Sequence, residues 1–110
     1  MEHPTIPAIS TSVTLAELRT LTIAQQKYDK RLTQIFEEAA NLWSGYINQY
    51  GTYELPALPT ATRMGIQVVL SSEALDAIDR IRTGHYSRAI AMYAAIRLWL
   101  DYEQQGILPT

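Results

Sequence analysis

In the stretch TRMGIQVVLSSE, which spans residues 62–73, Gln67 is a residue whose side chain can recognise a partner by hydrogen bonds. Its amide holds a donor and an acceptor, so it can bind two atoms on the major-groove edge of an adenine. Val69 could contact a thymine methyl group, whereas Gly65 offers nothing to a base edge. The residues that alternate with these three are apolar: Ile66, Val68 and Leu70. This period of two predicts a β-strand with an outward face around Gln67 and an apolar inward face.

The predicted strand needs a partner for its backbone N–H and C=O groups. We expect no second strand elsewhere in the chain, which leaves three solutions. The segment could be coil, it could lie exposed as an unpaired edge, or it could pair with the same strand of a second copy. A two-fold axis would make that last pairing antiparallel and self-complementary. The two strands would then form a ribbon narrow enough to enter the major groove of DNA.

The composition fits one small domain of 110 residues with a formal net charge of −2. Residues 1–61 hold four Lys/Arg and six Asp/Glu, and residues 62–110 hold five Arg and five Asp/Glu. This balance argues against a strongly basic nucleic-acid binder, although arginine suits bidentate contacts with phosphate. There is no Cys and the two histidines are far apart, so we expect no metal site and no cofactor. The carboxylates show no paired spacing near a candidate base or nucleophile, so we expect no enzyme.

The N-terminal stretch MEHPTIPAIS lacks the basic and apolar regions of a signal peptide, and no apolar run is long enough to span a membrane. We therefore expect a cytoplasmic protein without a membrane partner. Residues 1–13 contain two prolines and several Ser/Thr without periodicity, which predicts a flexible tail.

Residues 14–51 are predicted to form an N-terminal helical region. Thr14 and Glu17 have the spacing of a capping box, and Gly51 suits a helix C-terminus. Between them, apolar residues recur every three or four positions and form a face wider than the seam of a coiled coil. The cluster of β-branched residues at Thr20–Thr22 marks a point where the region could break into two helices.

Residues 52–62 contain two prolines and no periodicity, which predicts a linker. The second folded part then covers residues 63–106. After the strand, Ser71 or Ser72 is expected to cap one helix, and Ser87 is expected to cap the last one.

The order of strand, capped helix, Gly-containing turn and Ser-capped helix over residues 63–103 resembles the ribbon-helix-helix family of DNA-binding proteins (the MetJ/Arc type). The matching pieces are IQVVLSSEALDAID in residues 66–79, GHYSR in 84–88 and AAIRLWL in 94–100. The resemblance implies an intertwined homodimer whose short strands pair antiparallel and which binds DNA, usually as a repressor. It does not extend to residues 1–61.

The resemblance also implies roles for individual residues. The outward strand residues would contact bases: Arg63, Gly65, Gln67 and Val69. The start of the last helix would bind DNA phosphates, with the help of its dipole, at Tyr86, Ser87 and Arg88. The dimer core would hold apolar residues of all three elements: Ile66, Val68, Leu70, Leu75, Ile78, Met92, Ile96 and Trp99.

Two features depart from the family pattern. The three outward positions between the ends of the strand, Gly65, Gln67 and Val69, include one polar residue, so we expect modest sequence specificity. The last helix is apolar nearly all round, which means that another surface must cover it. The best candidate is the apolar face of residues 14–50, which includes Leu32, Phe36, Ala39 and Trp43. We therefore expect a mainly α fold, in which a long N-terminal helix, or two helices, packs on a C-terminal ribbon-helix-helix.

Two functions remain open. The first is a homodimer, possibly assembled into a tetramer, that binds double-stranded DNA and regulates transcription as a repressor. The second is a protein-interaction adaptor, antitoxin-like or plasmid-partition-like. In that case the ribbon-helix-helix part would mainly dimerise, and residues 14–50 would bind a protein partner.

Overall fold

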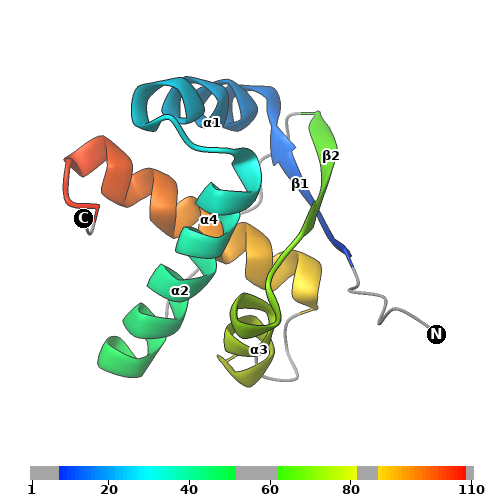
Figure 1. Cartoon of the computed structure of the whole chain (residues 1–110), viewed down its shortest axis with the longest axis vertical. Coiled ribbons are helices and arrows are strands. Elements are labelled where there is room, and N and C mark those ends of the chain that lie inside the picture. The colour runs from blue at the N-terminus through cyan, green and yellow to red at the C-terminus, as the bar shows by residue number, and fades with distance from the viewer. Residues whose placement is uncertain (1–7, 52–61, 82–86, 109–110) are drawn as a thin grey trace.

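The computed structural model describes residues 8–51, 62–81 and 87–108. In chain order the elements are β1 (Ala8–Thr14), α1 (Leu15–Tyr28), α2 (Leu32–Tyr50), β2 (Arg63–Val69), α3 (Ser72–Ile81) and α4 (Arg88–Gln105) (Figure 1). The mainly helical fold expected from the sequence is confirmed, with a small two-stranded sheet beside the helices. Of the predicted linker over residues 52–62, positions 52–61 lie outside the described residues.

The partner of the predicted strand lies in the same chain. β2 pairs antiparallel with β1, from Ala8 opposite Val69 to Thr14 opposite Arg63. The predictions of a single strand, and of a flexible tail over residues 8–13, are therefore wrong. The inward residues of β1 are almost fully buried: Ile9 is 2%, Thr11 6% and Val13 0% exposed. Because Ser and Thr occupy most of the other positions of β1, its apolar alternation is too short to be recognised in the sequence.

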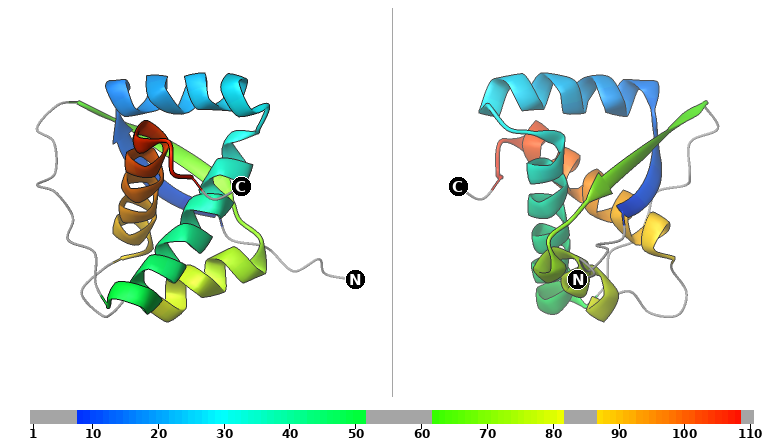
Figure 2. Two further views of the ribbon diagram at one scale, coloured as in Figure 1. Left: turned by 90° about the vertical axis from the view of Figure 1, so that its left-hand side faces the viewer. Right: turned by 45° about the vertical axis from the view of Figure 1, so that its right-hand side comes forward.

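The chain consists of two β-α-α units, β1-α1-α2 and β2-α3-α4, which we call the first and the second unit (Figure 2). Their strands begin 55 residues apart, at Ala8 and Arg63. The N-caps of α2 and α4 lie 56 residues apart, at Arg31 and Ser87. The middle residues of the two strands face one another. An approximate two-fold axis therefore passes through the middle of the ribbon, so β1 takes the place expected for the strand of a second copy.

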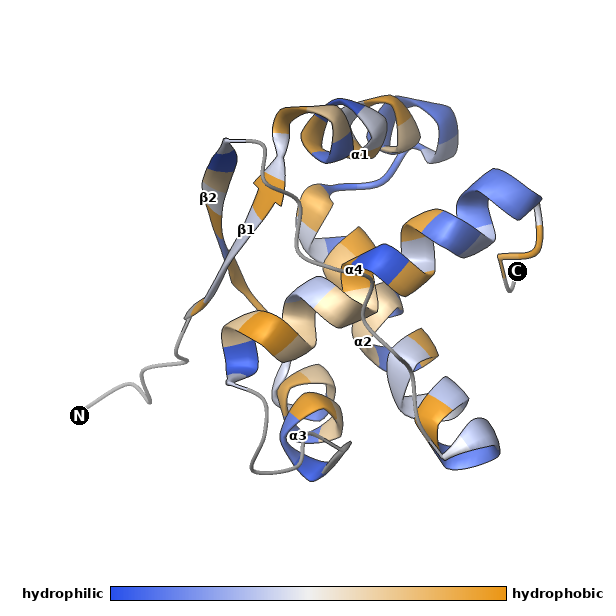
Figure 3. Cartoon of the chain, turned by 180° about the vertical axis from the view of Figure 1, so that it is seen from behind, coloured by the Kyte–Doolittle hydropathy of each residue, from blue (hydrophilic) through white to orange (hydrophobic). Residues whose placement is uncertain are grey.

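The helices α2 and α4 supply most of the hydrophobic core. Their buried faces are rich in alanine, which lets two helix backbones pack closely. The fully buried alanines are Ala39, Ala40, Ala91 and Ala95. In Figure 3 the apolar colour of the first turns of α4 gives way to hydrophilic residues toward its C-terminus. The expectation that residues 14–50 cover α4 is confirmed, because Phe36, Ala39 and Trp43 are buried in the common core and Leu32 packs against it.

The residues assigned to a dimer core lie in the core of one chain. Those that are buried are Val68, Leu70, Ile78, Met92, Ile96 and Trp99. Ile66 and Leu75 are partly buried against them. The first unit therefore covers the apolar face that the sequence analysis assigned to a second copy.

Local signals predicted most of the helix ends correctly. Thr14 Oγ1 accepts from the Glu17 N–H at 3.2 Å and Glu17 Oε1 accepts from the Thr14 N–H at 2.8 Å, which confirms the capping box. Ser71 Oγ accepts from a backbone N–H of the first turn of α3, and Ser87 caps α4 in the same way. Gly51 ends α2 with a left-handed φ of 82°, a conformation that glycine adopts without strain.

The break between the N-terminal helices lies elsewhere than predicted. The chain turns at Asp29, which has a left-handed φ of 52°, and not at Thr20–Thr22. Inside α1 the hydroxyl of Thr20 donates to Ala16 O, and that of Thr22 donates to Leu18 O, both at 3.0 Å. These bonds to the preceding turn allow the threonines to remain in the helix.

Candidate nucleic-acid interface

The outward face of the ribbon carries three polar side chains, of which Ser10 and Gln67 are exposed and Ser12 is partly exposed. Ser10 lies opposite Gln67, and Ser12 lies opposite Gly65. Gln67 Nε2 donates to Ser10 Oγ at 3.2 Å, which links the two strands across this face. Val69, at the end of β2, is 50% exposed. The structure therefore brings three of the predicted base-contacting residues together and adds two serines from β1 that the sequence analysis missed.

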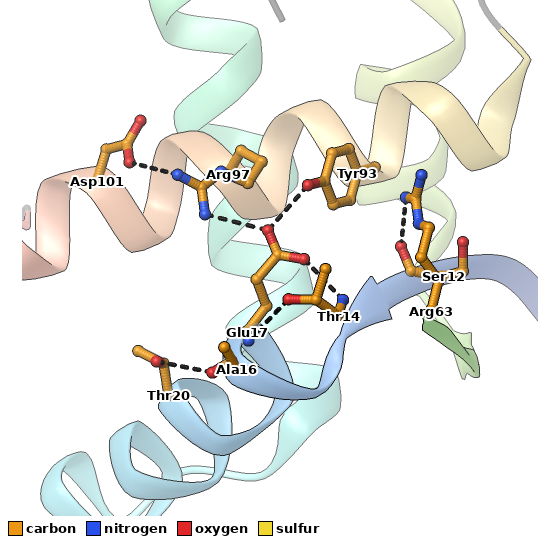
Figure 4. Close-up of polar contacts among 9 residues, drawn as sticks. All are labelled: Ser12, Thr14, Ala16, Glu17, Thr20, Arg63, Tyr93, Arg97 and Asp101. Atoms are coloured by element: carbon orange, nitrogen blue, oxygen red, sulfur yellow. Dashed lines mark hydrogen bonds and ion pairs between the residues drawn. The ribbon is translucent and has the colours of Figure 1, made fainter. Parts of the chain in front are cut away.

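Arg63, the fourth predicted base contact, folds along the side of the ribbon (Figure 4). Its Nη2 donates to Ser12 O at 2.7 Å, and its guanidinium carbon lies 4.5 Å from the centre of the Tyr93 ring. A guanidinium over an aromatic face is attracted by the ring quadrupole. The Nε of Arg63 is shielded from solvent and has no hydrogen-bond partner among the described residues. The charged group thus lies between β1 and α4.

A cavity of about 300 Å³ lies beside Arg63, between β1 and the first turns of α4. Ser10 and Ser12 line it from β1, and Ala89 lines it from α4. Thr11 Oγ1 donates to Ala89 O at 2.9 Å, which holds the start of α4 against β1. Ile90 and Tyr93 add apolar walls, whereas the Arg63 guanidinium and the nearby N-terminus of α4 favour an anionic oxygen. The cavity is therefore suited to a phosphate group.

The predicted phosphate contacts at the start of α4 already make bonds within the chain. Ser87 Oγ accepts from the Ile90 N–H at 3.2 Å. Arg88 donates from Nε and Nη2 to the two carboxylate oxygens of Asp79, at 2.9 and 2.6 Å. A guanidinium has five N–H donors, so Arg88 keeps donors beyond this pair. Tyr86 lies outside the described residues.

Glu17 supports the ring on which Arg63 lies (Figure 4). Its Oε2 accepts from the Tyr93 hydroxyl at 2.8 Å and from Arg97 Nη1 at 3.0 Å. Burial acts to raise the pKa of Glu17, but the bonds from Thr14, Tyr93 and Arg97 outweigh it, so this pKa lies below its ordinary value. Burial and then the bond to Glu17 raise the pKa of Tyr93 to about 12. At neutral pH the carboxylate is therefore charged, the phenol is protonated, and the bond between them is charge-assisted.

A repeat in the sequence could have revealed the missing strand. The pattern Leu-Trp-x-x-Tyr-x-x-Gln occurs in residues 42–49 and again in residues 98–105, toward the ends of α2 and α4. Internal repeats mark units of the same structure. A strand before the second pair of helices therefore implies a strand before the first pair, at the position of β1.

Among the residues that the structure describes, no group of three or more His, Cys, Asp or Glu side chains could hold a metal ion. None of the described helices is long and apolar enough to cross a membrane. No protein-family profile, curated protein or solved structure matches the chain. We therefore base the functional proposal on the ribbon, on Arg63 and on the start of α4.

Proposed function

We propose that one copy of this chain binds double-stranded DNA by placing the β1–β2 ribbon in the major groove, and that it regulates transcription as a repressor. The observation that carries the proposal is the outward face of the ribbon, where the exposed Ser10 and Gln67 and the partly exposed Ser12 carry hydroxyl and amide groups. The major groove is about 12 Å wide and admits a two-stranded ribbon. Hydroxyl and amide groups are among those that read base edges there.

Base reading is divided between the two strands. Gln67 binds an adenine edge through both atoms of its amide, and Val69 contacts a thymine methyl group. Ser10 and Ser12 each supply a hydroxyl that donates to or accepts from a base edge. Gly65 contributes no side chain and lets the ribbon approach the bases closely.

Phosphate binding occurs beside the ribbon. Arg63, directed to the cavity between β1 and α4, contacts the DNA backbone there instead of a base. Ser87 and Arg88, at the start of α4, also contact the DNA backbone, and Asp79 holds Arg88 in position for this contact.

The DNA site is predicted to be non-palindromic. The approximate two-fold axis of the ribbon makes Ser10 equivalent to Gly65, and Ser12 equivalent to Gln67. In a homodimer such equivalent positions carry identical residues, and the DNA half-sites mirror that symmetry. Here each pair differs, so the half-site read by β2 depends on an amide and the half-site read by β1 depends on hydroxyls.

The adaptor function has less support. The central apolar residues of α2, Phe36, Ala39 and Trp43, are buried in the core and are not available to a protein partner. The large apolar side chains that remain exposed in residues 14–50 are Leu15, Ile23 and Tyr50. We therefore favour DNA binding.

Fluorescence anisotropy with labelled duplexes of random sequence, at about 50 mM salt, tests the proposal. Binding should occur with one chain per site, and the logarithm of the association constant should fall with log salt by about 0.9 per phosphate neutralised. The substitution Gln67→Glu places a negative charge on the ribbon face and should abolish binding. Gln26→Glu makes the same change on an exposed position of α1 and should preserve it. No binding, a flat salt response or equal losses in both variants would refute the proposal.

A further inference from the structure

A second cavity, of about 500 Å³, lies between the C-terminal halves of α2 and α4. Its volume is within the range of small-molecule sites. Four aromatic residues line it: Tyr46, Tyr50, Trp99 and Tyr102. Glu38 is the charged residue among its described lining residues, which include no Lys or Arg. This cavity is separate from the ribbon, and DNA binding as proposed above does not use it.

The aromatic side chains of this cavity form a cluster. The rings of Tyr46 and Tyr50 lie 4.6 Å apart between centroids and are tilted by 45°. Burial, followed by the proximity of Tyr50 and Tyr46, raises the pKa of the Tyr102 phenol. Trp99 is 1% exposed and is held by an edge contact with the Tyr28 ring at 6.3 Å. Aromatic faces carry negative electrostatic potential and attract cations.

Glu38 brings a carboxylate with unused bonding capacity to this cluster. Its Oε1 accepts from Lys30 Nζ at 2.6 Å. Its Oε2 is shielded from solvent and has no hydrogen-bond partner among the described residues. Glu38 therefore supplies a negative charge, paired with Lys30, at the wall of the cavity. Asn41 and Gln49 add neutral polar groups to the lining.

We propose that this cavity binds a small organic ammonium ion with an apolar body. The ammonium group lies beside the carboxylate-bearing Glu38 and against the tyrosine rings, and the body fills the remaining volume beside Leu42 and Leu108. An anion would meet the carboxylate and the aromatic faces and is excluded. A neutral molecule of the same shape gains the apolar contacts and lacks the charge interactions.

The test is an NMR titration of the full-length protein with cyclohexylammonium and with cyclohexanol, which has nearly the same shape and no charge. The indole N–H signal of Trp99 reports on the cavity. Trp43, also buried but not among the described lining residues, serves as the internal reference. Cyclohexylammonium should bind saturably, shift Trp99 more than Trp43, and bind about tenfold more tightly than cyclohexanol.

Two variants separate charge recognition from simple apolar binding. Glu38→Gln should remove the preference for cyclohexylammonium, whereas Glu37→Gln, on the same turn of α2 but outside the described lining, should keep it. Tyr102→Leu keeps an apolar wall, so it should weaken cyclohexylammonium more than cyclohexanol. The proposal is overturned if the two ligands bind equally well, if no saturable shift occurs, or if both Glu38→Gln and Tyr102→Leu retain the preference.

Discussion

The two β-α-α units share an order of elements and differ in how each satisfies the N-terminus of its first helix. In the first unit, the N–H of the cap residue Thr14 bonds to Glu17, three residues further on. In the second unit, the N–H of the cap residue Ser71 bonds at 2.7 Å to Glu37, which lies on α2 of the first unit. In the first unit, the N–H of the cap residue is bonded within its own helix end. In the second unit, the N–H of the cap residue is bonded by a residue of the first unit. The first unit therefore supplies one bond at the start of α3, and Ser71 Oγ supplies the other within the second unit.

The carboxylates that fill these two roles also differ in burial. Glu17 is 7% exposed and uses its second oxygen to bind α4, so it joins β1 and α1 to the centre of the core. Glu37 is partly exposed, and its bond to Ser71 lies at the surface. Since the strength of such bonds rises as water is excluded, the two should contribute unequally to stability.

The largest expected effect comes from Glu17→Gln. This change removes the charge that Tyr93 and Arg97 share, and it should lower the free energy of unfolding by about 3 kcal/mol. The matched change Glu37→Gln affects one exposed bond and should lower it by about 1 kcal/mol or less. Urea denaturation of both variants measures the difference. Equal losses would show that the two caps are energetically alike.

The free energy of unfolding should depend on pH through the titration of Glu17. Because the pKa of Glu17 is lowered in the folded state, its contribution is present above the ordinary value of 4.5 and is lost as the pH falls through the lowered value. Tyr93 affects stability at high pH. Its contribution to the free energy of unfolding is fully present below the unfolded pKa of about 10 and is lost as the pH rises through about 12. Urea denaturation across pH should show a shallower acid decline in Glu17→Gln. An unchanged acid decline would contradict this assignment.

The outward strand residues offer the next comparison, with an expected effect of about 1–3 kcal/mol on base discrimination. Gln67→Ala should relax the preference for one base pair on one side of the DNA site. Ser12→Gln places an amide at the equivalent position of β1 and should turn the preferred sequence toward a palindrome. Selection from random duplexes measures both outcomes. A palindromic site for the unchanged protein would refute the asymmetry and leave DNA binding itself intact.

The smallest effect concerns phosphate binding by Arg63. Arg63→Gln should reduce affinity for all sequences alike and lower the slope of log affinity against log salt by about 1. Arg80→Gln, at an exposed position on α3, removes the same charge elsewhere and should leave the slope nearly unchanged. A change in base preference in Arg63→Gln would instead restore the base-reading role that the resemblance implied.

Much of this protein follows from the sequence because the responsible interactions are local. The capping box at Thr14 and Glu17, the cap at Ser87 and the helix end at Gly51 each depend on residues within one turn. The inward face of β2 and the need to cover α4 follow from the periods of apolar residues in the same segments. These predictions depend on no contact between distant parts of the chain.

Only the tertiary structure decided which strand pairs with β2. The pairing joins segments 55 residues apart, and the strand at Ala8–Thr14 has too few apolar residues to be recognised by its own pattern. The same holds for Arg63, which lies over Tyr93, and for Glu37, which bonds to Ser71. Each of these contacts forms because packing the two units together brings the partners within reach. A sequence pattern that describes neighbouring residues carries no information about these contacts between distant residues.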